Sequence, residues 1–252
     1  MIVTQNKTTT LYSYQNGIGA NTEAILNRTL RHILYGDDIV TTAMQDEYLE
    51  NVVALIHFDD GFNDEKGHTP VASGNPYIQS SISKFGSAVE FDGSSKIDYG
   101  ISSDFAFGNG AFTIEGFLRR NRSVEVEVFI SLRIYGSGNA ETSDGCMISL
   151  RNGILSFSAD GVWNDGALVS DSAFQHFAIC RDISNNIKIF LDGALVSSFL
   201  TTHNFGSSRR LVIGASDSIA NPGYFSGYLD EVRITKGVCR YVNTFTPPMV
   251  PF

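Results

Sequence analysis

From residue 51 to its end, the sequence is a series of short apolar segments separated by glycine-rich turns, with no helical pattern between them. About a dozen of these segments have the length and alternation of β-strands. Two pairs of segments are joined by Asn152-Gly153 and Asp192-Gly193, dipeptides that accept the positive φ of a type I′ hairpin turn. Short strands without intervening helices bury their apolar faces by stacking two sheets. The sequence therefore predicts an all-β, two-sheet antiparallel sandwich over residues 51–252.

Residues 1–50 have a different pattern and are predicted to form a short N-terminal helical or extended arm. Asn21-Thr22-Glu23 has the composition of a helix start, and Gly36 stands where a helix end favours a left-handed residue. The apolar residues at helical spacing between them are Leu26, Leu30, Ile33 and Leu34. An isolated helix of about 14 residues is marginally stable. We therefore expect this stripe to pack on the following domain, on a sister subunit or on another protein, as a docking or oligomerisation segment.

Composition excludes several classes of partner. The net charge of −9 repels a phosphate backbone, and the arginine doublets at 119–120 and 209–210 are isolated, so no nucleic-acid partner is expected. No apolar run approaches the length of a membrane helix, so no membrane insertion is expected. Cys146, Cys180 and Cys239 lack the spacing of a zinc site, and the last two are interpreted as small buried apolar residues.

The last strand-like segment, residues 227–236, is the most distinctive. Its alternation predicts Tyr228, Asp230, Val232 and Ile234 on one face. It resembles the closing strand of concanavalin A-like lectin/glucanase jelly rolls, in their laminin-G-like and pentraxin-like branch. Four further blocks resemble strands of that family in the same order: VALIHFD at 53–59, FGSAVEFDG at 85–93, FGNGAFTIE at 107–115, and QHFAICR at 175–181 followed by IKIFLDG at 187–193.

The resemblance implies a jelly-roll domain over residues 51–252 and a function in binding. Such domains are frequent in bacteriophage virion and tail proteins, and the chain starts without the pattern of a secretory signal. We therefore expect a virion surface protein, made in the host cytoplasm, that acts as a tail fibre, an adhesin or a capsid decoration. Other virion proteins, further copies of the chain and a host surface glycan are its expected partners, and it is not expected to be an enzyme.

The resemblance also implies a structural calcium ion, which in this family often ties the first loop to the closing strand. Asp64 and Asp230 are the residues expected to hold it, and the acidic loop at 59–65 offers the many oxygens that calcium requires. The alternative is that Asp230 accepts hydrogen bonds from backbone amides of the loop, without an ion.

A glycan site is predicted around Trp163, the only tryptophan. An aromatic ring flanked by polar groups suits a sugar, because the ring packs on the pyranose while the polar groups bind its hydroxyls. The residues predicted to bind the glycan are Trp163, Asp160, Asn164, Asp165 and the loop residue Tyr224. The alternative is that Trp163 folds back and closes one end of the sandwich.

A glycan-cleaving enzyme on the same fold is the competing hypothesis. Glu125 and Glu127 would lie on one face of a strand, roughly 6.6 Å apart, within the range of glycosidase carboxylate pairs. However, the third acid of the laminarinase-like signature is absent from this strand. We interpret the two glutamates as the solvated face of a half-buried strand.

Overall fold

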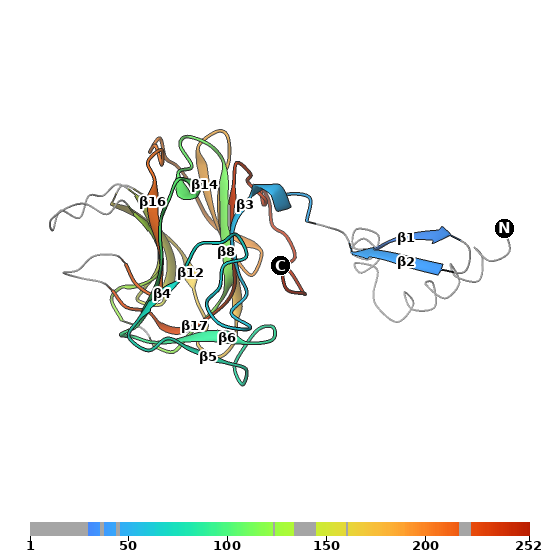
Figure 1. Ribbon diagram of the computed structural model, residues 1–252. Helices are drawn as coiled ribbons and strands as arrows, with labels where there is room; N and C mark the ends of the chain where they lie inside the picture. Colours follow the sequence, from blue (N-terminus) through green and yellow to red (C-terminus); the bar gives the residue numbers. More distant parts are fainter. Residues whose placement is uncertain are drawn as a thin grey trace. The chain divides into compact units, whose positions relative to one another are not determined.

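The computed structural model describes residues 30–35, 38–43, 46–122, 124–133, 145–159, 161–216 and 223–252. The chain divides into two compact units, residues 1–49 and residues 50–252. In the second unit, two sheets face each other as a sandwich, and every pair of neighbouring strands is antiparallel among the described residues (Figure 1). The predicted two-sheet antiparallel jelly roll is therefore confirmed.

Each sheet is built from strands that are far apart in the sequence. The seven-stranded sheet contains, in spatial order, β12 (Val162–Leu168), β11 (Ile154–Ala159), β10 (Gly145–Arg151), β9 (Glu127–Arg133), β16 (Arg209–Ile213), β7 (Lys96–Ser102) and β4 (Val71–Ser73). The eight-stranded sheet contains β15 (Ala194–Leu200), β14 (Asn186–Leu191), β13 (Gln175–Arg181), β8 (Phe112–Arg120), β17 (Ser226–Lys236), β6 (Ala88–Asp92) and β5 (Tyr77–Gln79), with β3 (Val52–Ile56) also paired to β17. Two short 3₁₀ turns, η1 (Leu49–Asn51) and η2 (Ser103–Phe105), precede β3 and follow β7.

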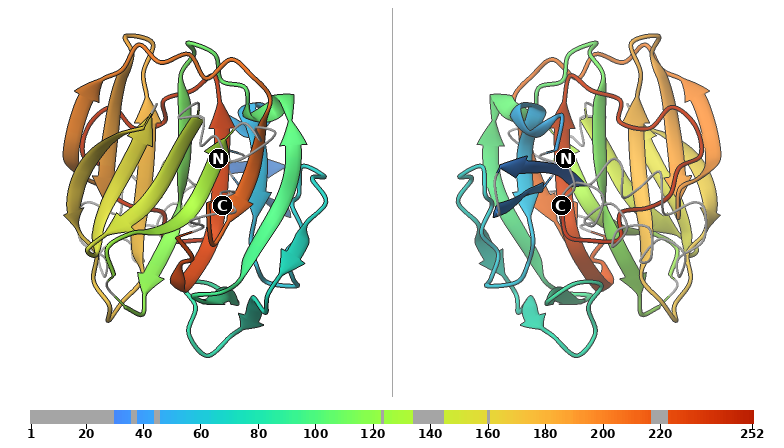
Figure 2. Two further views of the ribbon diagram at one scale, coloured as in Figure 1. Left: turned by 90° about the vertical axis from the view of Figure 1, so that its left-hand side faces the viewer. Right: turned by 90° about the vertical axis from the view of Figure 1, so that its right-hand side faces the viewer.

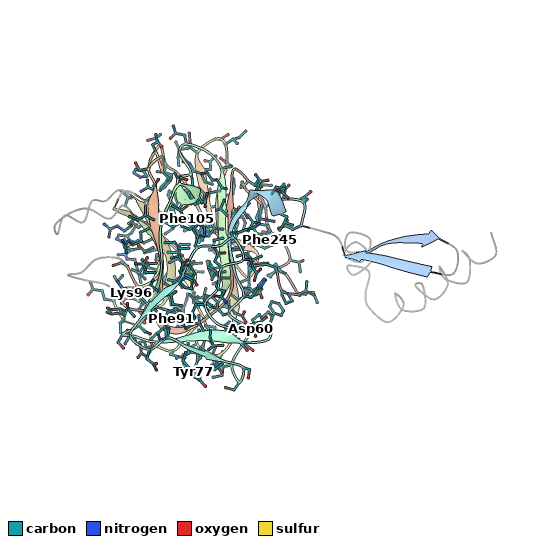
Figure 3. All side chains as sticks on the ribbon, in the orientation of Figure 1. Asp60, Tyr77, Phe91, Lys96, Phe105 and Phe245 are labelled. Carbon is teal, nitrogen blue, oxygen red and sulfur yellow. The ribbon has the colours of Figure 1, made fainter. Side chains whose placement is uncertain are left out.

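The hydrophobic core lies between the two sheets. The six residues that the strand pattern places there, Ile56, Phe91, Ile114, Ile189, Leu191 and Ile213, are all buried in one apolar cluster. Figure 3 shows Phe91 and Phe105 in this layer, whereas Phe245 lies outside it. Burial of aromatic and β-branched side chains on both inner faces supplies the main driving force for the fold.

The two hairpin turns predicted from dipeptides are present. Asn152 and Gly153 have φ values of +51° and +79°, and Asp192 and Gly193 have φ values of +48° and +76°. Positive φ at both central residues is the signature of a type I′ turn. The turns fix the registers of β10 with β11 and of β14 with β15.

The regular alternation predicted for β17 is wrong, because the strand contains a bulge. Its pairing with β8 runs from Asp230 opposite Phe117 to Arg233 opposite Glu115, so β17 carries one residue more than its partner. Glu231, inside this bulge, has a φ of +54°. A bulge reverses the inward and outward faces beyond it. Consequently Leu229, Val232 and Ile234 point into the core, and Tyr228 and Asp230 do not share their face.

The C-terminal segment, residues 237–252, covers the outer face of the eight-stranded sheet (red in the right-hand view of Figure 2). Tyr241 and Phe245 stack on each other and pack against Ala178, Cys180 and Phe190 of β13 and β14. Phe245 also forms a hydrogen bond from its N–H to the carbonyl of Gly193. This segment, hereafter the C-terminal strap, gives the sandwich a third layer on one side.

In the first unit, the predicted helix is wrong over residues 30–35, which form β1 (Leu30–Tyr35), paired with β2 (Asp38–Ala43). Leu30, Ile33 and Leu34 therefore lie on a strand, and Leu26 lies outside the described residues. Two residues of sequence, Gly36-Asp37, separate the paired strands, a composition typical of hairpin connections. The β-branched run at 39–42 favours a strand over a helix. The assembly role of these residues remains a prediction.

Within the described part of the chain, no helix has the length and apolar character needed to cross a membrane.

Candidate functional site

Trp163 lies on β12, an edge strand of the seven-stranded sheet, and not in a loop as predicted. It pairs with Ser158 of β11, is half-buried, and has the Arg151 guanidinium 5.2 Å from its ring centre. It does not belong to the core cluster, so it does not close the end of the sandwich. Its ring forms a cation–π contact on the outer face of the sheet.

Asp165 shares that outer face with Trp163. Its carboxylate accepts hydrogen bonds from Arg151 Nη1, at 3.0 and 3.2 Å, and from the Ser156 hydroxyl at 2.6 Å. The carboxylate is therefore engaged by neighbours from β10 and β11. This small network positions Trp163 and Arg151 relative to each other.

The other three predicted glycan residues do not join this face. Asn164 pairs with the core residue Phe157, so alternation places it on the opposite face of β12. Tyr224 lies beside Val128 of β9, and Arg122 donates a hydrogen bond to its carbonyl. Asp160 lies outside the described residues. The five residues thus do not form one site.

Asn164 lines a groove of about 550 Å³ where the edge strands β12 and β15 of the two sheets meet. The opposite wall is the end of β15 and the loop that follows it, residues 201–204. Apolar surface comes from Ala159, Val162, Phe199 and Leu200, and polar groups come from Asn164, Thr201, Thr202, His203 and Asn204. None of these described lining residues is an acid, a lysine or an arginine, so the groove presents amide, hydroxyl and imidazole groups.

The loop that forms the polar wall is held in place by hydrogen bonds to neighbouring residues and by one hydrogen bond within the loop. Thr201 N donates to the Asn185 carbonyl at 3.0 Å, and its own carbonyl accepts from Arg181 Nη2 at 3.3 Å. His203 N donates to the Thr201 hydroxyl at 3.2 Å, and its ring packs edge-on against Phe205. The wall is therefore largely preformed, which reduces the entropy lost when a ligand binds.

Sequence reasoning missed this wall. The signal was the run Thr-Thr-His-Asn at 201–204, directly after a predicted strand. Such a run indicates a polar loop, but only the packing of β15 beside β12 brings it opposite Asn164.

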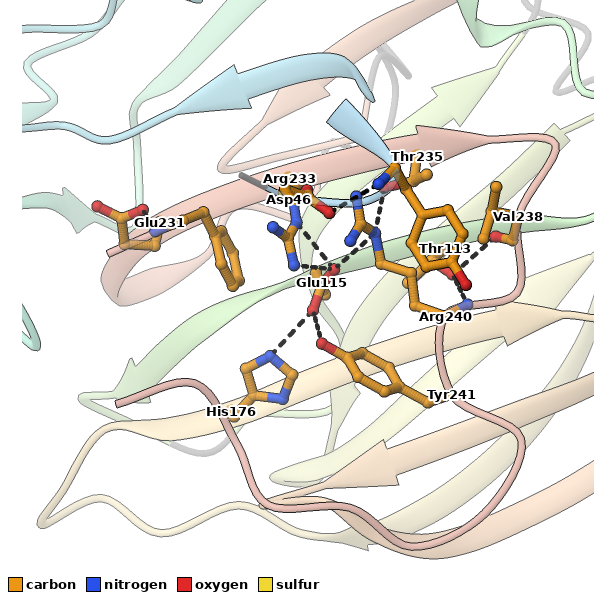
Figure 4. Close-up of polar contacts among 12 residues, drawn as sticks. Asp46, Thr113, Glu115, His176, Glu231, Arg233, Thr235, Val238, Arg240 and Tyr241 are labelled. Carbon is orange, nitrogen blue, oxygen red and sulfur yellow. Dashed lines mark hydrogen bonds and ion pairs between the residues drawn. The ribbon is translucent and has the colours of Figure 1, made fainter. Parts of the chain in front are cut away.

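A second polar cluster lies under the C-terminal strap, around Glu115 of β8 (Figure 4). Glu115 accepts hydrogen bonds from Arg233 Nε and Nη2, at 3.0 and 2.9 Å, and from the Tyr241 hydroxyl at 2.8 Å. His176 Nε2 lies 3.3 Å from the same carboxylate and Arg240 Nε lies 3.6 Å away. Burial would raise the pKa of Glu115, but Arg233, His176 and Arg240 outweigh burial and hold this pKa at about 2. A fully buried carboxylate that is charged at neutral pH fastens the strap to the sheet.

The glutamates of the hydrolase hypothesis do not form a pair. Glu125 is exposed and precedes β9, whereas Glu127 is completely buried, so a solvated acidic face is wrong for Glu127. One oxygen of Glu127 accepts hydrogen bonds from Arg122 Nε and Ser226 N, at 2.9 and 3.0 Å. Burial raises the pKa of Glu127. Its contacts join the start of β9 to β17.

Asp64 and Asp230, the predicted calcium ligands, each accept hydrogen bonds from other residues of the protein. Asp64 accepts hydrogen bonds from Leu55 N and Lys66 N through one oxygen, and from His68 Nδ1 through the other. Asp230 accepts from Lys84 N and Phe85 N through Oδ2, while its buried Oδ1 has no hydrogen-bond partner among the residues that the structure describes. Among the described residues, no three acidic, histidine or cysteine side chains converge as a metal site would require. Calcium needs six to eight oxygens, and both carboxylates already accept hydrogen bonds from the protein, so the calcium site remains a prediction.

Asp230 should make the stability of the domain depend on pH. Burial raises the pKa of its carboxyl to about 7, against the opposing hydrogen bonds from Phe85 and Lys84, with Glu231 and Asp59 adding to the rise. Because the folded pKa exceeds the unfolded value near 3.9, stability falls as pH rises from about 4 to about 7. In thermal melts, Asp230→Asn should have a flatter pH profile than wild type across this window.

The same thermal melts, repeated with a chelator, test whether Asp230 binds calcium. We expect a chelator to leave the melting temperature of the wild type unchanged at pH 7, because amide donors already bind Asp230. A chelator-induced drop that is absent from Asp230→Asn would instead support calcium at this residue. An identical pH profile for the two proteins would contradict the raised pKa.

Comparison with known proteins agrees with the fold. A family model described as the concanavalin A-like lectin/glucanases superfamily matches residues 92–239, and no curated protein matches the sequence. Domain 4 of an extracellular GH43 arabinanase from Geobacillus stearothermophilus, solved in complex with arabinotriose, has a TM-score of 0.57 at 18% identity. That alignment covers 75% of this chain and 94% of the arabinanase domain.

Toxin binding domains are also similar in structure. The binding domain of Paraclostridial Mosquitocidal Protein 1 has a TM-score of 0.57 at 15% identity, and that of botulinum neurotoxin serotype D/C has 0.55 at 14%. Both alignments cover 75% of this chain and 50% of the toxin chain, so the match spans half of those structures. The family model covers more than half of the chain. The chain therefore belongs to the concanavalin A-like lectin/glucanase superfamily, as a lectin-like jelly-roll domain.

Proposed function

We propose that this domain is a non-catalytic carbohydrate-binding module, and that it binds a neutral saccharide in the groove between β12 and residues 201–204. The observation that carries the proposal is the lining of that groove. Its amide and hydroxyl groups match the hydroxyls of a sugar, and Val162 and Leu200 offer apolar surface to the C–H faces of the ring. The absence of charged groups among its described lining residues favours a neutral ligand over an anionic one.

The volume of the groove, about 550 Å³, is in the range of small-molecule sites. The similar arabinanase domain was solved with arabinotriose, which makes arabinan oligosaccharides the first ligands to test. A glycan-array screen would extend the search to other neutral sugars.

Asn164→Ala should weaken saccharide binding about tenfold, because a hydrogen-bonding amide is worth about 1.4 kcal/mol. Isothermal titration calorimetry with the best saccharide from the screen measures this loss. Trp163→Ala is the matched control, since Trp163 neighbours Asn164 on the same strand but faces the opposite way. Binding lost in Trp163→Ala and kept in Asn164→Ala would move the site to the outer face of the sheet.

We further propose that the module serves attachment on a bacteriophage virion surface, as a tail fibre, an adhesin or a capsid decoration. Residues 1–50 would dock it to other virion proteins or to sister copies, and the groove would face a host glycan. Two features support this division: the chain separates into two compact units near residue 50, and the family blocks all lie in the second unit.

Deleting residues 1–50 should leave a folded jelly roll that no longer assembles. Circular dichroism and thermal melting test the fold, and light scattering together with incorporation into particles tests assembly. A truncated protein that unfolds, or one that still assembles as the full chain does, would contradict the docking role.

A further inference from the structure

Cys180 and Cys239 lie next to each other where the C-terminal strap crosses β13. Cys180 is fully buried on the outer face of β13, and Cys239 is half-buried in the strap. Cys239 packs against the buried cluster that contains Cys180, and its thiol donates a hydrogen bond to the Tyr241 carbonyl at 3.3 Å. The two residues are far apart in the sequence, so the fold of the strap creates this pair.

The side chain of Thr113 fixes the position of the pair. Its hydroxyl lies 3.5 Å from Cys180 Sγ and donates a hydrogen bond to the Val238 carbonyl at 2.9 Å. The same hydroxyl accepts a hydrogen bond from Arg240 N, also at 2.9 Å. The residues on both sides of Cys239 are therefore held to the threonine that neighbours Cys180. Stacked Tyr241 and Phe245 close the cluster from the strap side.

We propose that Cys180 and Cys239 form an oxidation site, which a small-molecule disulfide converts into an intramolecular disulfide that fastens the strap to β13. The inference does not depend on the proposed sugar site. It predicts a strap held by hydrogen bonds and packing in a reducing compartment, and by a covalent bond in an oxidising one.

The reaction proceeds by two thiol–disulfide exchanges. The Cys239 thiolate attacks one sulfur of the small disulfide, forms a mixed disulfide and releases one thiolate. Cys180 then loses its proton to solvent and attacks the sulfur of Cys239, which forms the protein disulfide and expels the second thiolate. The protein loses two protons and two electrons, and the small disulfide takes them up and becomes two thiols.

The order of attack follows from the environments of the two thiols. Cys239 is partly accessible, and the neighbouring Cys180 thiol lowers its pKa, with Lys188 acting in the same direction. Burial raises the pKa of Cys180. Cys239 is therefore the attacking thiol and Cys180 the resolving one.

Cys146 provides a matched control. It lies on β10, is 2% exposed and belongs to the core between the sheets, and burial raises the pKa of its thiol to about 12. It should remain a free thiol under conditions that oxidise the other two.

The test is incubation of the folded full-length chain with oxidised glutathione, followed by intact-mass and peptide mass spectrometry and a thermal melt. Wild type and Cys146→Ser should each lose two hydrogens and give a crosslinked peptide containing residues 180 and 239. Their melting temperatures should rise by roughly 5–10 °C, because the crosslink restricts the unfolded chain. Cys180→Ser should instead stop at a glutathione adduct on Cys239, and Cys239→Ser should gain neither crosslink nor stability.

Three results would overturn the proposal, and each can be read from wild-type protein. The folded chain could keep three free thiols, although the same chain oxidises when unfolded in urea. Cys239 could accumulate the glutathione adduct without a crosslink. A crosslink could form that includes Cys146.

Discussion

Replacing Glu115 with alanine should lower the free energy of unfolding by about 3–5 kcal/mol, the usual cost of removing one member of a buried ion pair. Glu115 is fully buried and accepts hydrogen bonds from Arg233 and Tyr241, with His176 and Arg240 close by. Alanine removes the acceptor that Arg233 and Tyr241 share inside the protein. Urea unfolding at pH 7 measures the loss.

Two further variants separate the contribution of the Glu115 charge to stability from that of a single hydrogen bond. Glu115→Gln keeps the shape but removes the charge, and should cost less than alanine. Tyr241→Phe removes a single hydroxyl and should cost about 1 kcal/mol. A loss below about 1 kcal/mol for Glu115→Ala would show that this cluster does not hold the strap.

The contribution of Glu115 should also disappear in acid. Its pKa is held at about 2 in the folded protein, below its ordinary value near 4.5. Because the pKa is lower in the folded than in the unfolded protein, the charged carboxylate contributes its full stabilisation above about pH 4.5. This stabilisation is lost as the pH falls toward 2. Wild type should therefore lose stability between about pH 4.5 and pH 2 relative to Glu115→Gln.

Gly193→Ala should be the next most damaging substitution, at about 3 kcal/mol. Gly193 has a φ of +76°, which costs a residue with a side chain about 1 kcal/mol. A Cβ atom there would also lie 1.9 Å from the carbonyl oxygen of Phe245, so the strap would have to move away. Overpacking of this kind costs about 1–3 kcal/mol more.

Gly100 isolates the backbone part of this effect. Its φ is +77°, but a Cβ added there has no atom within 4 Å. Gly100→Ala should therefore cost only about 1 kcal/mol. Equal losses for the two variants, measured by urea unfolding, would mean that contact with the strap adds nothing at Gly193.

Most of the sandwich follows from sequence because strand pattern and turn chemistry are local properties. Strand-like patterns identified β8, β13, β14 and the position of β17, although not its bulge, and dipeptides with positive φ identified the turns between β10 and β11 and between β14 and β15. Each prediction depends on a few consecutive residues. The family blocks, which follow one another along the sequence in the family's order, then identified the sandwich as a jelly roll.

The predictions that failed concern features of the fold that depend on contacts between residues far apart in the sequence. The bulge at Glu231 is stabilised by its carboxylate, which binds the His57 ring and the Phe252 amide, and neither partner is near it in the sequence. β12 was overlooked because its polar run, Trp163-Asn164-Asp165, resembles a loop until β11 pairs with it. In the arm, apolar spacing suited a helix, but β-branched residues and a two-residue connection favour a hairpin.

The candidate site was only partly predictable for the same reason. Sequence reasoning chose a segment that includes Asn164, but it treated this segment as a loop and grouped neighbours that alternation sends to opposite faces. The wall at residues 201–204 comes from the other sheet, and no local pattern links it to β12. Only the meeting of two sheet edges creates the groove.

The most direct test of saccharide binding in this groove is a nuclear magnetic resonance titration of the ¹⁵N-labelled chain with the best neutral oligosaccharide. The largest shifts should fall on Asn164 and residues 201–204, with little change at the Trp163 indole N–H. Shifts centred on Trp163 and Arg151, or on Tyr224, would contradict the assignment of the groove. If no neutral oligosaccharide produced shifts, the carbohydrate-binding function itself would be contradicted.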